Sequence, residues 1–226
     1  MPDTTPAFPP ASSPASGSDY LRDPDAIYAR SFAIIEAEAG PALGSLPAEL
    51  RPVARRLIHS CGMTDIVQDL AFAGPVVAAA RAALAAGRPI LADVEMVRAG
   101  IIARRIPLGV EVRCTLGDAE IPALAARLET TRSAAAVELW RPELEAAVVV
   151  IGNAPTALFH LLGRLRDWPE RPAAILAFPV GFVGAVESKE ALIAAGLGLP
   201  YLTLRGRRGG SAMAAAAVNA LLETPA

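Results

Sequence analysis

The stretch Ala146-Ala-Val-Val-Val-Ile151-Gly-Asn-Ala-Pro-Thr156 joins a continuous apolar run to a glycine loop and a helix start. A short run that is apolar at every position is typical of a strand buried on both faces, as in a parallel sheet. The glycine allows a sharp turn after the strand, and the proline favours the start of a helix over residues 156–166. This stretch therefore predicts one strand–loop–helix unit of an α/β fold.

Two further units of the same kind follow it. Their predicted strands are residues 173–178 and 201–204, their loops are Pro179-Val-Gly-Phe-Val-Gly184 and Arg205-Gly-Arg-Arg-Gly-Gly-Ser211, and their helices are residues 187–195 and 211–222. Because crossovers between parallel strands are right-handed, all three glycine loops should lie at the carboxyl ends of the strands, where such sheets bind ligands. The fold class predicted is a three-layer α/β fold with a mostly parallel sheet.

The rest of the chain supplies the covering elements. Asp23 before Pro24 predicts a helix start, and apolar residues continue at helical spacing to Gly40. Further helices are expected over residues 48–60, 75–86, 119–128 and 131–140, and strands over residues 88–93 and 110–116. Residues 1–18 contain many Pro, Ser and Thr and are interpreted as a flexible tail, and residues 19–226 as a single α/β domain.

Composition excludes several classes of protein. The 226 residues carry a net charge of −2 and are 53% hydrophobic, which argues against a disordered body and against general nucleic-acid binding. Mean hydropathy is +0.40, but the longest apolar runs, such as residues 146–151 and 212–218, are far shorter than the roughly 18–20 residues of a membrane span. Two cysteines without a CxxC pair, and no secretory signal, fit a reducing cytoplasm.

The three glycine loops are candidate anion sites. None matches GxGxxG or GxxxxGK[ST], so a dinucleotide fold or a P-loop is disfavoured. Their backbone N–H groups are expected to face an anion, and the third loop adds Arg205, Arg207 and Arg208 and a predicted Ser211 cap, which suits carboxylates or phosphates. The alternative is that the glycines serve only tight turns. Lys189, the single lysine, either meets a carboxylate or is a solvated helix charge.

The chain has two histidines, His59 and His160, and histidine is the residue type most often used to move protons at neutral pH. His160 lies within a predicted helix, where a packed or surface role is expected. His59 ends a helix, whose carbonyl groups favour a cationic side chain, so it is either a cap or a proton donor. Asp93 and Glu95 lack a third ligand nearby, so no metal and no other cofactor are predicted.

Several motifs together resemble the precorrin-8X methylmutase family. They cover residues 20–222 in order: Asp25-Ala-Ile-Tyr-Ala-Arg-Ser-Phe32, Ile58-His-Ser-Cys-Gly62, Asp93-Val-Glu-Met-Val97, Thr131-Arg-Ser-Ala-Ala135, Ile151-Gly-Asn-Ala-Pro-Thr-Ala157, Pro179-Val-Gly-Phe-Val-Gly-Ala185 with Glu187-Ser-Lys189, and Arg205-Gly-Arg-Arg-Gly-Gly-Ser-Ala-Met213.

The resemblance implies an isomerase that moves a methyl group from C-11 to C-12 of precorrin-8X, giving hydrogenobyrinate. It implies His59 as the catalytic proton donor or acceptor, a corrinoid polycarboxylate as substrate, and a homodimer. Because the methyl group moves within one molecule, no methyl donor is expected, and the balanced charge and short apolar runs predict no nucleic-acid or membrane partner. The substrate-binding residues predicted from these motifs are Ser31, Arg132, Ser133, Asn153, Gly181, Lys189, Arg207, Gly209 and Ser211.

Three alternatives remain open at this stage. The protein is a corrinoid carrier without catalysis, or it acts on cobalt-precorrin-8, or it is an unrelated α/β enzyme for a phosphorylated small molecule. An intact His59 with Ser31 and Arg132 favours the enzyme over the carrier.

Overall fold

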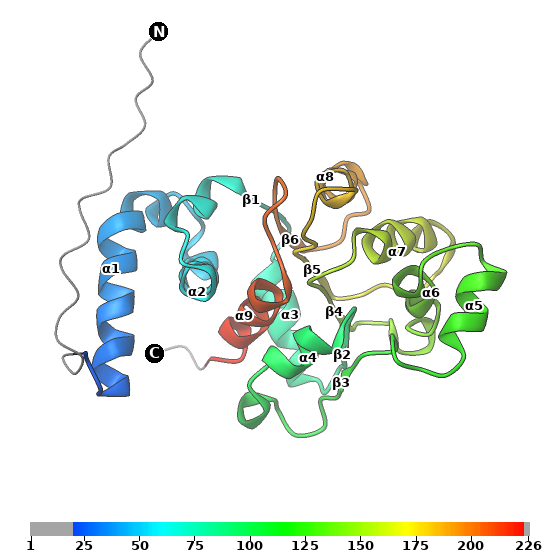
Figure 1. Cartoon of the computed structure of the whole chain (residues 1–226), viewed down its shortest axis with the longest axis horizontal. Coiled ribbons are helices and arrows are strands. Elements are labelled where there is room, and N and C mark those ends of the chain that lie inside the picture. The colour runs from blue at the N-terminus through cyan, green and yellow to red at the C-terminus, as the bar shows by residue number, and fades with distance from the viewer. Residues whose placement is uncertain (1–19, 224–226) are drawn as a thin grey trace, which may run out of the picture.

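The computed structural model describes residues 20–223, so the predicted tail over residues 1–18 lies outside the described residues. A six-stranded sheet with the order β1-β6-β5-β4-β2-β3 runs through the centre (Figure 1). Neighbouring strands are parallel except β1, which is antiparallel to β6. The strands are β1 Leu70–Ala73, β2 Ile90–Ala92, β3 Val112–Arg113, β4 Val148–Ile151, β5 Ala174–Ala177 and β6 Tyr201–Leu204.

Helices cover both faces of this sheet, which confirms the predicted three layers. One face packs against α2 (Arg51–Cys61), α3 (Val76–Ala85), α4 (Glu95–Gly100) and α9 (Ser211–Leu221), with α1 (Pro24–Gly44) outside α2. The other face packs against α6 (Arg132–Glu138), α7 (Pro155–Asp167) and α8 (Ala185–Ala194), with α5 (Ile121–Arg127) against α6. Short 3-10 helices are Ala48–Leu50, Thr64–Asp69, Ala103–Arg105 and Arg141–Glu143.

Strand β4 shows why an apolar run predicts a central strand. Val148 and Val150 belong to the core on the α9 side, and Val149 and Ile151 to the core on the α7 side. Because successive strand residues point to opposite faces, a strand covered on both faces has to be apolar throughout. The apolar run thus places β4 at the centre of the fold.

The sequence expectations differ from the structure mainly in the first half of the chain. Helix α1 continues past Gly40 and Pro41 to Gly44, where Leu43 is buried. The strand expected over residues 110–116 is only two residues long, and β1 and α4 were not expected. Strand β1 is four residues long and is defined by its pairing with β6, which cannot be read from local sequence.

Candidate active site

Backbone hydrogen bonds join the three glycine loops into one row beyond the sheet. Val180 N–H donates to the Asn153 carbonyl (3.4 Å), Gly181 N–H to the Arg207 carbonyl (3.3 Å), and Gly210 N–H to the Phe178 carbonyl (2.8 Å). The loops follow β4, β5 and β6, which are adjacent and parallel. This confirms that the loops share one edge, where ligands of such sheets bind.

The first loop is held by Asp93, which follows β2. The Asp93 carboxylate is 2% exposed and accepts hydrogen bonds from the N–H groups of Gly152 (2.8 Å), Asn153 (2.9 Å) and Ala154 (2.9 Å). Burial raises the pKa of Asp93 above its ordinary value, and the three N–H groups oppose that rise. The prediction that these N–H groups face a bound anion is therefore wrong, because an internal carboxylate already occupies them.

Two loop glycines are required by close packing. A Cβ at Gly152 would lie 2.6 Å from Val97 Cγ2 and 2.9 Å from Ser211 Cα, and a Cβ at Gly209 would collide with the carbonyl oxygens of Phe178 and Pro179. Gly209, predicted to contact substrate, thus has a packing role in joining the second and third loops.

The three arginines of the third loop have different partners. Arg205 pairs with Glu190 (2.6 Å), and Arg208 pairs with Asp65 (2.7 Å) and Asp69 (2.5 Å). The hydrogen bonds to these two carboxylates raise the pKa of Arg208 above its ordinary value. Arg207 is exposed, with its guanidinium 5.3 Å from the centroid of the Phe182 ring, and it has no carboxylate partner within residues 20–223. Of these three, Arg207 is the one whose charge is open to a ligand.

Lys189 is neither a solvated charge nor an open ligand group. Its side chain is 0% exposed, and Nζ donates to the Arg208 carbonyl at 2.8 Å. Burial lowers the pKa of Lys189 to about 8. In the structure Lys189 supports the third loop from beneath, and its contact with a substrate carboxylate stays a prediction. The predicted Ser211 cap is wrong: Gly210 is the N-cap residue, and Ser211 is the first residue of α9.

His59 lies in the last turn of α2, which ends at Cys61 and is capped by Gly62 with φ +71°. The exposed imidazole stacks on the Phe32 ring (centroids 5.1 Å apart, planes at 21°) and lies 5.7 Å from the Tyr28 ring. His59 and Ser31 line the same pocket of about 280 Å³. The structure thus brings two predicted site residues together and adds two aromatic rings that sequence reasoning did not single out.

Arg132 and Ser133 begin α6. The Thr131 cap accepts from Ala134 N–H (3.2 Å) and donates to Thr156 Oγ1 (2.8 Å), so Arg132 lies exposed beside the first turn of α7. In Figure 1, α6 and α2 lie at opposite sides of the molecule, with the ends of β4, β5 and β6 between them. A ligand that contacts both His59 and Arg132 of the same chain therefore extends across the loop row.

The second histidine, His160, is held by a carboxylate on a neighbouring helix. His160 Nε2 lies 2.5 Å from Glu138 Oε1, which Arg164 also contacts at 2.6 Å, so its packed role is confirmed. In the described part of the chain, no cluster of three or more His, Cys, Asp or Glu side chains is arranged to hold a metal ion. Nor does any helix within it have the length and apolar character to cross a membrane.

The fold and site define an α/β enzyme with an exposed imidazole beside a row of glycine loops. A model of the precorrin-8X methylmutase family matches residues 26–224. Precorrin-8X methylmutase from Pseudomonas aeruginosa is 59% identical, covering 90% of this chain and 97% of that one, and the one from a Sinorhizobium species is 55% identical, covering 90% and 96%. The crystal structure of the Thermus thermophilus precorrin-8x methyl mutase superposes with a TM-score of 0.78 at 37% identity, covering 88% and 94%. This chain belongs to the precorrin-8X methylmutase family.

Proposed function

We propose that the protein catalyses the intramolecular shift of a methyl group from C-11 to C-12 of precorrin-8X, giving hydrogenobyrinate. The observation that carries this proposal is the exposed His59 imidazole, stacked on Phe32 in the same pocket as Ser31. Membership of the family supports this proposal, because the similar proteins from Pseudomonas and Sinorhizobium are named precorrin-8X methylmutase.

His59 acts as the proton donor or acceptor. The methyl group moves within one molecule, so the reaction needs no methyl donor and no covalent nucleophile. A proton placed on the conjugated macrocycle draws electron density away from the migrating group. General acid–base catalysis by a positioned side chain contributes roughly 10²–10⁴-fold to the rate.

Polar groups along the loop row bind the carboxylates of the substrate. Arg207 offers an exposed guanidinium at its centre, and Arg132 and Ser133 lie at its α6 end. Asn153, Gly181 and Ser211 are partly exposed in or beside the loops. Lys189 and Gly209 contribute through the shape of the third loop. Bidentate pairing with arginine suits carboxylates.

The metal-free substrate is favoured over its cobalt complex. The relatives named precorrin-8X methylmutase are 59% and 55% identical, whereas a cobalt-precorrin-8 methylmutase from Priestia megaterium is 35% identical. Parallel assays with precorrin-8X and cobalt-precorrin-8 test this choice. Preferential turnover of the cobalt form would overturn it.

Two features support a homodimer. A pocket of about 280 Å³ beside His59 is small for a tetrapyrrole, because even drug-sized ligands occupy roughly 300–1,000 Å³. Ile27, Tyr28 and Ile34 leave apolar surface exposed on α1 next to that pocket. A second subunit would enlarge the site and cover this surface. Light scattering of the purified protein at one protomer mass would contradict the dimer.

His59→Ala separates the enzyme from a carrier. We expect the variant to lose turnover while still shifting the visible spectrum of added hydrogenobyrinate, because binding uses the loops. Full turnover would remove His59 from the mechanism, and a wild-type protein that binds hydrogenobyrinate without converting precorrin-8X would support the carrier. Stabilisation by phosphorylated metabolites but not by corrinoids would support an unrelated α/β enzyme for a phosphorylated small molecule.

The free thiols of Cys61 and Cys114 fit the cytoplasmic location that we propose.

A further inference from the structure

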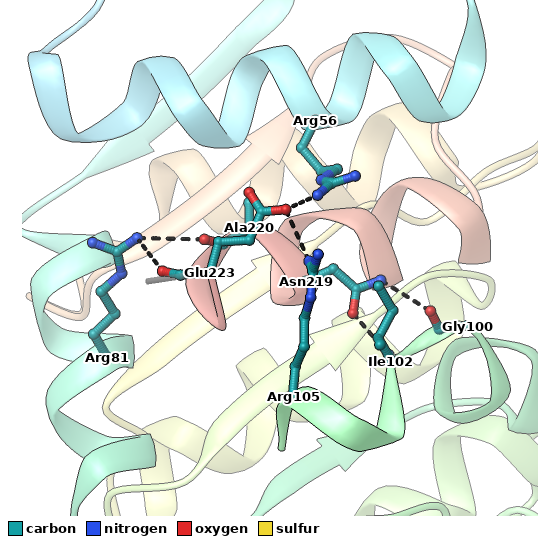
Figure 2. A network of polar contacts seen from close by, with 8 residues as sticks. All are labelled: Arg56, Arg81, Gly100, Ile102, Arg105, Asn219, Ala220 and Glu223. Carbon is teal, nitrogen blue, oxygen red and sulfur yellow. Dashed lines mark hydrogen bonds and ion pairs between the residues drawn. The ribbon is translucent and has the colours of Figure 1, made fainter. Parts of the chain in front are cut away.

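Three arginines from three different elements hold the C-terminal end of α9 (Figure 2). Arg56 of α2 and Arg105 of the 3-10 helix Ala103–Arg105 both pair with the Glu223 carboxylate, Arg105 at 2.8 Å. Arg81 of α3 donates to main-chain carbonyl oxygens of Ala220, Leu221 and Glu223. The Glu223 carboxylate is therefore fixed in place and serves as the counter-charge of Arg56.

Arg56 lies between this carboxylate and two aromatic rings. It is 9% exposed, and its guanidinium carbon is 5.5 Å from the Tyr28 ring centroid and 5.8 Å from that of Phe32. Its buried Nε has no hydrogen-bond acceptor among the described residues. A buried guanidinium is stabilised by a paired anion and by ring faces, and here Glu223 and the two rings supply them.

The same two rings contact His59. Phe32 stacks on the imidazole at 5.1 Å, and Tyr28 lies 5.7 Å from it and 4.5 Å from Phe32. Arg56 precedes His59 by three residues on α2, so both side chains project from one side of that helix. A continuous series of contacts thus runs from Glu223 through Arg56 and the two rings to His59.

We infer that Arg56, anchored by Glu223, is a positioning residue for His59. The planar guanidinium fixes the planes of Tyr28 and Phe32, and the rings fix the direction in which the imidazole faces its pocket. The residues that line this pocket include His59 and Ser31 but not Arg56, so Arg56 acts on the imidazole through the rings. The inference rests on the proposed catalytic role of His59. It adds that the C-terminal end of α9 orients the imidazole, through Glu223, Arg56 and the two aromatic rings.

Imidazole NMR signals provide a test that needs no turnover. The chain has two histidines, so a single His160→Gln variant assigns the ring protons of both. In Arg56→Met we expect the His59 ring signals to move toward those of an unstacked imidazole, while the His160 signals stay in place. We also expect kcat to fall about tenfold to a hundredfold, because small displacements of a catalytic group have effects of this size, with KM within about twofold.

Two further variants make the test specific. Arg98→Met is the control, because Arg98 is an exposed arginine of α4 that pairs with Glu95 outside this network, so kcat and the His59 signals should match wild type. Glu223→Gln keeps the Arg56 side chain but removes its counter-charge, and should shift the His59 signals in the same direction as Arg56→Met, by less.

Each outcome decides the inference. Unmoved His59 signals in folded Arg56→Met overturn it, as does a kcat of Arg56→Met equal to that of the control Arg98→Met. If Arg56→Met does not fold, Glu223→Gln decides, and unmoved His59 signals there overturn the inference. If His59→Ala retains full turnover, the proposed catalytic role fails, while the NMR signals still show whether Arg56 holds the imidazole.

Discussion

Lys189 Nζ donates a hydrogen bond to the carbonyl oxygen of Arg208 at 2.8 Å, from a side chain that no solvent reaches. This contact joins α8 to the loop after β6 and holds that loop from beneath. A buried ammonium is an unfavourable group unless it is well paired, and here the group that accepts its hydrogen bond is a neutral carbonyl. The pKa of Lys189 is accordingly lowered from 10.5 to about 8.

This shift predicts how stability depends on pH. Between about pH 8 and 10.5 the unfolded chain holds the Lys189 proton more tightly than the folded chain, so Lys189 makes the free energy of unfolding rise with pH in that window. From pH 7.5 to 10, wild type should gain about 1–3 kcal/mol relative to Lys189→Met. Urea unfolding at several pH values measures the free energy of unfolding of both proteins. The other titrating groups are common to the two proteins, so their contributions cancel when the two free energies are subtracted. Parallel stability profiles would contradict the prediction.

Asp93→Asn should destabilise the first glycine loop. The variant amide presents one oxygen where the carboxylate has two, and its NH₂ group would face a backbone N–H, so at least one of the donors at Gly152, Asn153 and Ala154 is left without its partner. An unsatisfied buried donor costs about 1–3 kcal/mol, and we expect a loss in that range by urea unfolding. Glu95→Gln is the control, because Glu95 is exposed and so is Arg98, with which it forms an ion pair. Equal losses in the two variants would show that the loop does not depend on Asp93.

Gly152→Ala should be destabilising because of a steric collision, even though the backbone there is not left-handed. The added methyl group would lie 2.6 Å from Val97 Cγ2 and 2.8 Å from Ala214 Cβ, so β4, α4 and α9 would have to separate. Overpacking of this kind costs about 1–3 kcal/mol. Gly117→Ala is the matched control, since nothing lies within 4 Å of a Cβ at that position. A melting temperature unchanged in both variants would contradict the packing role.

Local sequence was sufficient for the elements that are buried on both faces. The apolar run over residues 146–151 and the glycine after it predict β4 and its loop, because burial on both faces and a sharp turn leave a local signature. Strand β1 has no such signature, since it depends on pairing with β6, more than 120 residues later. The same holds for the partners of Asp93 and Arg208, which come from distant segments.

In the candidate site, too, local sequence predicted some residues, while the partners of others depend on contacts between distant segments. The motifs pointed to His59 and Ser31, and the structure places both at one pocket. The sequence predicts an anion site at the third loop from its three arginines, but Arg205 and Arg208 are paired with carboxylates of α8 and of residues 64–69. Those pairings depend on tertiary structure. The roles of the predicted residues in catalysis and substrate binding stay predictions.

The difference among these arginines gives a prediction about substrate binding. Arg207 carries an exposed guanidinium over Phe182, while Arg205 is paired with Glu190. A charge-assisted hydrogen bond is worth about 1.5–3 kcal/mol, so Arg207→Met should raise KM for precorrin-8X about tenfold to a hundredfold, with kcat little changed. Arg205→Met should leave KM within about twofold, because the Arg205 guanidinium is already engaged by Glu190. Loss of this exposed ion pair should lower the free energy of unfolding by at most about 1 kcal/mol. Steady-state kinetics of both variants measure the contrast. If Arg205→Met raises KM as much as Arg207→Met, the ion pair with Glu190 does not keep Arg205 from the substrate, and the carboxylates bind a wider part of the third loop.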